Sequence, residues 1–172
     1  MGNCYSCLIN HRLKKTNNDI PFFSLNGKTF HVKVVDVYDG DTCSVVFLFK
    51  NRFTKFRVRC AGYDSPEMKP LKSESERDTI IINAYKARNF FAHRTTNCHI
   101  DIDSQLSKKE MSELIKNNTK IIQMKCDGWD KYGRLLGHFY VNNIYINEEM
   151  IIRNYGYPYN GGTKQTTQNN HI

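Results

Sequence analysis

No run of apolar residues in this sequence is long enough to cross a membrane as a helix. The N-terminus also lacks the apolar centre of a secretory signal, because residues 10–15 turn polar and basic. Acidic residues are scarce: 17 Asp and Glu stand against 25 Lys and Arg, which gives a formal charge of +8. This excess favours a polyanionic partner, either nucleic acid or an anionic membrane surface, and its sign alone does not choose between them.

The sequence also lacks a set of cysteines and histidines spaced to hold a metal. The six histidines are scattered, and the Cys4-x-x-Cys7 pair is not followed by a second pair at zinc-finger spacing. Cys43, Cys60 and Cys126 fall in strand-like runs, where buried free thiols are common. Because no secretion signal is present, we expect a reducing compartment and no disulfides.

The composition predicts one globular domain with a hydrophobic core, since 40 % of the residues are apolar and 12 % are aromatic. We divide the chain into a basic leader and linker (1–26), a folded domain (27–160) and a disordered polar tail (161–172). A monomer is the default expectation, and no internal repeat is evident.

Alternating apolar residues predict five strands, separated into two groups by helical patterns. The strands are expected at 29–38, 42–50, 54–61, 120–126 and 134–141. Helices are expected after Pro70, with Ser73 or Ser75 as the cap, and over 106–118 and 147–153. The first three strands are joined by short turns and so form an antiparallel meander, which indicates a barrel or a sandwich.

The first six residues, MGNCYS, match the pattern for N-myristoylation at Gly2. Cys4 and Cys7 are placed to accept a second acyl chain, and a basic cluster follows over residues 11–15. These features predict lipid anchoring at the cytoplasmic face of a membrane. The alternative is a soluble cytoplasmic protein with a disordered basic leader.

The stretch from Arg59 to Glu67 presents an arginine at a strand end and two carboxylates, Asp64 and Glu67, on the turn that follows. A further acid, Asp41, lies upstream, and a second arginine, Arg134, lies downstream. Carboxylates on turns suit a hard cation such as calcium or magnesium. A cation beside arginines is suited to chemistry on a phosphodiester, so the pattern predicts a metal-dependent nuclease.

The order of these motifs resembles that of the staphylococcal-nuclease-like (thermonuclease) family. The resemblance covers DGDT at 39–42, the 59–67 stretch, DKYGR at 130–134 and Asn147-Glu148, within residues 27–159. It implies an α+β fold, namely a five-stranded OB-fold β-barrel with flanking helices. It also implies calcium-dependent endonucleolysis of DNA and RNA.

The resemblance further implies a role for each matching residue. Asp41, Asp64 and the Ser65 carbonyl correspond to calcium ligands, and Glu67 corresponds to the residue that positions or deprotonates the attacking water. The arginine pair that grips the phosphate is Arg59 and Arg134, and the nucleotide pocket is lined by Lys131 and Tyr132. Two guanidiniums can bind a phosphoryl group bidentately, which a lysine cannot imitate.

Each motif taken alone also has a structural interpretation, because Asp-Gly-Asp turns and charged strand residues are ordinary. Their joint order favours the nuclease over a non-catalytic nucleic-acid-binding OB-fold module, which would not need the carboxylates. A lipidated adaptor that binds protein is a third and weaker possibility. The chain departs from the family in an added helix at 106–118 and in the absence of a C-terminal helix after Gly156. Tyr157 and Tyr159 could stack on a base or pack at an edge.

Overall fold

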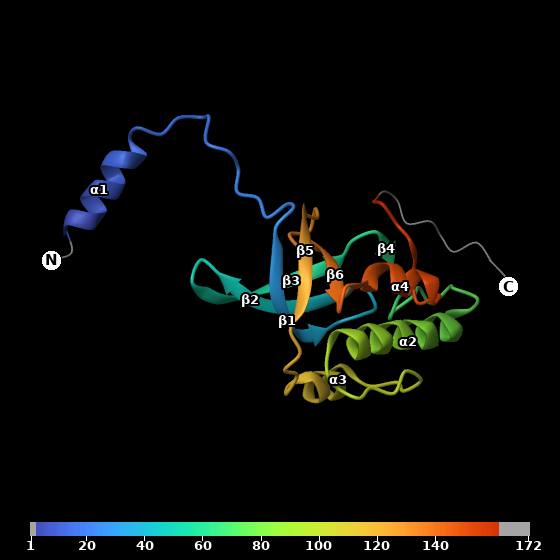
Figure 1. Ribbon diagram of the computed structural model, residues 1–172. Coiled ribbons are helices and arrows are strands. Elements are labelled where there is room, and N and C mark those ends of the chain that lie inside the picture. The colour runs from blue at the N-terminus through green and yellow to red at the C-terminus, as the bar shows by residue number, and fades with distance from the viewer. Residues whose placement is uncertain (1–2, 162–172) are drawn as a thin grey trace.

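Five long strands form a closed barrel in the computed structural model, which describes residues 3–161. Neighbouring strands run antiparallel in the order β3-β2-β1-β5-β6, and a parallel pairing of β3 with β6 closes the barrel. The predicted five-stranded OB-type barrel of an α+β protein is therefore confirmed (Figure 1). The long strands are β1 (Thr29–Val37), β2 (Thr42–Phe49), β3 (Arg52–Cys60), β5 (Ile122–Trp129) and β6 (Leu135–Val141).

The strands of the barrel contribute every second side chain to a common core. Every second residue of β6 from Leu135 to Val141 is buried, and the same holds for β5 from Ile122 to Cys126. The buried Phe47 is stacked between Phe30 and Phe56 at centroid distances of 4.3 and 4.7 Å. β6 carries a glycine where it meets β3, because a Cβ on Gly137 would lie 2.7 Å from a Val58 methyl group.

Helix α2 (Arg77–Thr95) lies along the barrel and places small residues against it, among them Ala84 and Ala87. The helix begins later than the sequence suggested: Ser73 and Ser75 lie in turns before it, and neither caps it. Glu76 occupies the N-cap position without making a side-chain cap hydrogen bond.

Helix α3 (Lys108–Ile115) is shorter than the predicted 106–118 helix. A capping box explains its start, because the Ser107 side chain accepts from Glu110 N–H and the Glu110 carboxylate accepts from Ser107 N–H. Past its end, the Asn118 side chain donates to the Val34 carbonyl of β1 and so ties the segment to the barrel. On α3, Met111 is buried, whereas Leu114, three positions later, is 42 % exposed.

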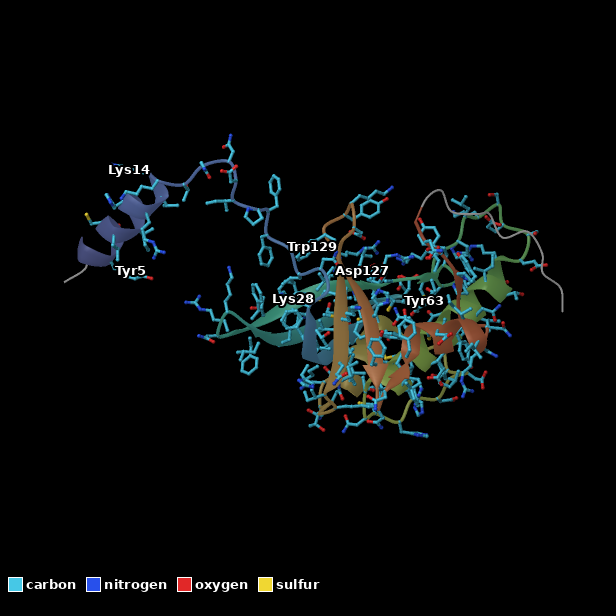
Figure 2. The ribbon with its side chains drawn as sticks, turned by 45° about the horizontal axis from the view of Figure 1, so that its top comes forward. Tyr5, Lys14, Lys28, Tyr63, Asp127 and Trp129 are labelled. Carbon is cyan, nitrogen blue, oxygen red and sulfur yellow. The ribbon has the colours of Figure 1, made fainter. Side chains whose placement is uncertain are left out.

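The N-terminal segment contains a helix that the sequence did not predict, α1 (Asn3–Leu13). Figure 1 shows α1 standing away from the barrel at the end of an extended segment, and Figure 2 shows Tyr5 and Lys14 there, far from the buried Tyr63. Leu25, just before the expected domain start at residue 27, is packed into the core. Within residues 3–161, no helix has the length and apolarity needed to traverse a bilayer.

The last strand of the described residues packs against the turn that follows β3. The hairpin strand β7 (Ile144–Tyr145) leads into α4 (Ile146–Ile152), and β8 (Tyr157–Pro158) then pairs antiparallel with β4 (Tyr63–Asp64). Residues 157–161 contain no helix, and the rest of the segment after Gly156, where a C-terminal helix was expected to be absent, lies outside the described residues. The expected polar tail lies, except for Gly161, outside the described residues.

A buried asparagine fastens α4 to the barrel. The Asn147 amide oxygen accepts from Phe139 N–H at 2.9 Å, and its amide nitrogen donates to the carbonyls of Ala61 and Gly137 at 2.9 and 3.0 Å. These bonds join α4 to β6 and to the end of β3, immediately before the turn that carries Asp64.

We predict that Asn147→Ala lowers the free energy of unfolding by about 3 kcal/mol, because it removes the side-chain partner of two buried backbone groups, Phe139 N–H and the Ala61 carbonyl. Chemical denaturation measures the change, and Asn83→Ala on the exposed face of α2 is the matched control. Equal midpoints for the two variants would contradict the anchoring role.

Candidate active site

The site is centred on Arg59, whose guanidinium bridges two buried carboxylates. Its Nη1 pairs with Asp41, and its Nη2 pairs with Asp64 at 2.8 Å. Asp41 is 4 % exposed and Asp64 is 2 % exposed. Three separate segments meet here: the turn after β1, the end of β3, and β4. The structure therefore brings together three of the residues that the sequence selected.

The Asp41 turn is shaped by its neighbour Asp39. The Asp39 carboxylate accepts from the N–H groups of Asp41 (3.1 Å) and Thr42 (2.6 Å), which closes the turn locally. Tyr63 then donates its hydroxyl to the Gly40 carbonyl at 2.6 Å. Only glycine fits at position 40, because an added Cβ would lie 2.7 Å from the Ser65 Cβ and 2.8 Å from the Ala87 methyl carbon on α2.

Ser65 holds the second oxygen of Asp41. Its backbone N–H and its hydroxyl both donate to Asp41 Oδ2, at 2.9 and 3.1 Å. The sequence pointed to the Ser65 carbonyl as a metal ligand, whereas the contacts observed here use the N–H and hydroxyl groups of the same residue. The turns carrying Asp41 and Asp64 are thus docked directly onto each other.

Tyr157 is a site residue that sequence reasoning did not assign to this cluster. Its hydroxyl donates to Asp64 Oδ2 at 3.1 Å, because β8 pairs with β4 and brings residue 157 beside residue 64. Burial and the nearby Asp64 charge raise the pKa of Tyr157, so the phenol stays protonated as a donor. No local pattern signals this contact, since the two residues are 93 positions apart.

The surroundings shift the pKa values of the two acids in this turn, Asp39 and Asp41, in opposite directions. Burial alone would raise the pKa of Asp41, but the positive charge and hydrogen bonds of Arg59 hold it below its ordinary value. Burial, together with the charge of Asp41, raises the pKa of Asp39 to about 7. Asp41 is therefore the ionised partner of Arg59 at neutral pH, while Asp39 is only partly ionised.

The second arginine is held by the loop before β6. Asp130 organises this loop: one oxygen accepts from Tyr132 N–H and Arg134 N–H at 2.9 and 2.8 Å, and the other accepts from Arg134 Nε at 2.6 Å. Arg134 Nη1 also contacts the Thr42 hydroxyl at 3.3 Å, and that hydroxyl donates to Asp41 at 2.9 Å. Thr42 thus links Arg134 to the Asp41–Arg59 cluster.

An open pocket of about 530 Å³ lies beside Arg134. The ring of Tyr132 lines it and lies 5.5 Å from the Arg134 guanidinium, and Lys131 lies 5.1 Å above that ring. Arg57, which the sequence analysis did not select, also lines the pocket. A pocket walled by guanidiniums and one aromatic ring is suited to a phosphate beside a nucleobase.

The remaining predicted residues lie at the edge of this cluster or beyond it. Glu67 is exposed, three residues after Asp64 at the outer end of the same turn. Cys4 lies in α1, away from the site, and Gly2 lies outside the described residues.

The cluster contains oxygen donors of the kind that a metal ion needs. No group of three or more acidic, histidine or cysteine side chains within residues 3–161 is arranged to hold one. Two buried carboxylates and a serine are nevertheless the hard oxygen donors that calcium prefers, with water completing the set. Arg59 already pairs with the carboxylates of Asp41 and Asp64, so a metal ion bound by these two acids would compete with its guanidinium.

Comparison with known families agrees with this geometry. The model of the family described as staphylococcal nuclease homologue matches residues 57–171. This chain belongs to that family. The match includes Arg59, Asp64, Glu67 and Arg134 but starts after Asp41, and the fold supplies Asp41 through its contact with Arg59. No curated protein matches the chain.

For this staphylococcal nuclease homologue we predict that Tyr63→Phe lowers the free energy of unfolding by about 1–2 kcal/mol. The substitution leaves the buried Gly40 carbonyl without its hydroxyl donor while keeping the ring. Thermal or urea unfolding followed by circular dichroism measures the loss. Tyr5→Phe, on the exposed α1, is the control; indistinguishable stabilities would show that the Tyr63 hydroxyl does not secure the acidic turn.

Proposed function

We propose that this protein is a calcium-dependent endonuclease that hydrolyses phosphodiester bonds of DNA or RNA. The observation that carries the proposal is the single buried cluster in which Arg59 bridges Asp41 and Asp64 and in which Thr42 connects Arg134. A purely nucleic-acid-binding barrel needs cationic side chains but has no use for two buried carboxylates. The family match supports a nuclease-type fold.

In the proposed mechanism the two arginines bind the scissile phosphate. A guanidinium carries five N–H donors. The three acceptors that Arg59 contacts within residues 3–161 are Asp41, Asp64 and the Tyr63 carbonyl, and they leave donors for a phosphoryl oxygen. Arg134 presents its guanidinium beside the open pocket. Negative charge grows on the phosphoryl oxygens as a nucleophile adds, so both donors stabilise the transition state more than the ground state.

Glu67 is the proposed acceptor for the proton of the attacking water. Its carboxylate is exposed at the end of the Asp64 turn, where water is available. The water oxygen forms the new bond to phosphorus, the bond to the leaving sugar oxygen breaks, and the leaving oxygen takes a proton. When bound by Asp41, Asp64 and Ser65, calcium would supply positive charge that acidifies water and offsets charge on the phosphate.

The test is digestion of single-stranded DNA with calcium and with a chelator, for the parent and for Arg59→Ala, Glu67→Ala and Arg134→Lys. We expect chelation to abolish cleavage and each substitution to lower kcat/KM by about two to three orders of magnitude, since each removes a group that acts on the transition state. Arg153→Ala, which removes an exposed guanidinium just after α4, should leave the rate unchanged.

The outcomes separate the parts of the proposal. Cleavage that is indifferent to the chelator and to all three substitutions would eliminate the mechanism. Cleavage that needs Arg59 and Glu67 but not a divalent ion would refute the calcium dependence and would leave the phosphodiester hydrolase standing.

We also propose that the N-terminus anchors this enzyme at the cytoplasmic face of a membrane, through a myristoyl group on Gly2 and a second acyl chain on Cys4. Support comes from the MGNCYS pattern, from the exposed thiol of Cys7, and from the basic residues at the end of α1 and just beyond it. Because α1 stands away from the barrel, a tether there would leave the active site open to substrate (Figure 1).

We predict that Gly2→Ala moves the protein from the membrane to the soluble fraction of expressing cells, because the myristoyl acceptor is lost. Fractionation followed by immunoblotting measures the shift, and Asn18→Ala in the linker is the control. Equal membrane association of the parent and the Gly2→Ala variant would rule out acylation at this position.

A further inference from the structure

The hairpin formed by β2 and β3 carries charge of one sign. Residues 42–60 contain five cationic side chains and no carboxylate. The turn between the two strands extends beyond the rest of the barrel, on the side away from α2 and α4 (Figure 1). A hairpin without acidic residues of its own carries a net positive charge, which attracts a polyanion. The five cations are Lys50, Arg52, Lys55, Arg57 and Arg59.

Strand alternation places three of these cations in one row. Residues 53, 55, 57 and 59 share a face of β3, whereas Val58 and Cys60 point into the core. The register with β2 sets Thr42 opposite Arg59 and Ser44 opposite Arg57. Thr42 is the residue that contacts Arg134, so the row starts at the candidate active site.

The second member of the row opens directly onto the pocket of that site. Arg57 lines the pocket together with Tyr132 and Arg134. Arg57 and Lys55 are both exposed, and neither forms an ion pair within residues 3–161. Their charges are thus available to an anionic ligand, unlike the charge of Arg59, which the protein itself neutralises in part.

The row ends in an exposed apolar pair. Phe53 is 82 % exposed and lies opposite Leu48, which is 56 % exposed. An aromatic ring held in water at the end of a cationic row is suited to stack on an unpaired base. Arg59 lies six positions after Phe53, a span of about 20 Å, or about 7 Å for each step of two residues. That step resembles the spacing of phosphates in an extended single strand.

We propose that this outer face of the β2–β3 hairpin binds the single strand that extends from the scissile phosphate. Arg57 and Lys55 contact successive phosphates, and Phe53 stacks on a base. The inference rests on the proposed nuclease function and adds a substrate-binding track to it. A single strand is favoured over a duplex because a duplex keeps its bases stacked internally, out of reach of Phe53.

The track is tested by measuring equilibrium binding of a fluorescent twelve-nucleotide single-stranded DNA to the full chain, with chelator present to prevent cleavage. We expect Lys55→Gln/Arg57→Gln to weaken binding at least about tenfold and to reduce the slope of log K against log salt by about 1.4, since each lost phosphate contact removes about 0.7 for single strands. Phe53→Ser should weaken binding about tenfold without changing the slope.

The matched control removes the same charge elsewhere. Lys109→Gln/Lys125→Gln changes two exposed lysines, on α3 and β5. It should leave both the affinity and the salt slope within about twofold of the parent, because those residues lie outside the row. Equal losses in the two double variants would mean that only net charge matters, and would overturn the track.

Further arms separate this inference from the proposed function. Parent protein that binds the strand but never cleaves it with calcium would refute the nuclease and leave the track standing. Cleavage at the parent level with unchanged strand binding in Lys55→Gln/Arg57→Gln would refute the track alone. Equal affinity for duplex and single strand would also overturn it. The track would also be overturned if these variants lost binding to phosphatidylserine vesicles but kept their binding to the single strand, since the hairpin would then be a membrane contact.

Discussion

The site depends on one ionic interaction, the bridge from the Arg59 guanidinium to the carboxylates of Asp41 and Asp64. Two acids this deeply buried would repel each other and would lose their hydration without a compensating cation. Arg59 supplies that cation from the penultimate position of β3, where its backbone is fixed by pairing to β2 and β6. The charges are therefore held by the barrel rather than by mobile loops.

Several hydrogen bonds from uncharged donors fix the positions of the groups in this cluster. The Tyr63 hydroxyl holds the Gly40 carbonyl, Ser65 holds one oxygen of Asp41, and Tyr157 holds one oxygen of Asp64. Each contact joins two segments that are distant along the chain. Carboxylates that receive hydrogen bonds on their outer oxygens keep a defined orientation, which a metal or phosphate site requires.

The sequence predicted the barrel because its strands alternate, as β6 shows at every residue from Leu135 to Val141. It predicted that Asp41, Arg59 and Asp64 belong together because they stand in family order, and the structure places them in contact. It did not assign Tyr157 to the site, because β8 is two residues long and its pairing with β4 has no periodic signal. Apolar spacing did not decide burial on α3 either, because Leu114 follows the buried Met111 at helical spacing and is nevertheless 42 % exposed.

The same strand performs two tasks, and its alternation explains how. Residues 56, 58 and 60 of β3 enter the core, so their identity is limited to apolar side chains and the strand is held in register. Residues 53, 55, 57 and 59 are then fixed on the opposite face at regular intervals, with Arg59 turned toward the acids and Arg57 toward the pocket. A one-residue slip of β3 would bury the arginines and expose Val58, which makes the alternative register prohibitively unfavourable. The positions of the cations are thereby set by the hydrophobic core, and it follows that their spacing is a rigid property of the barrel rather than an adjustable property of a loop.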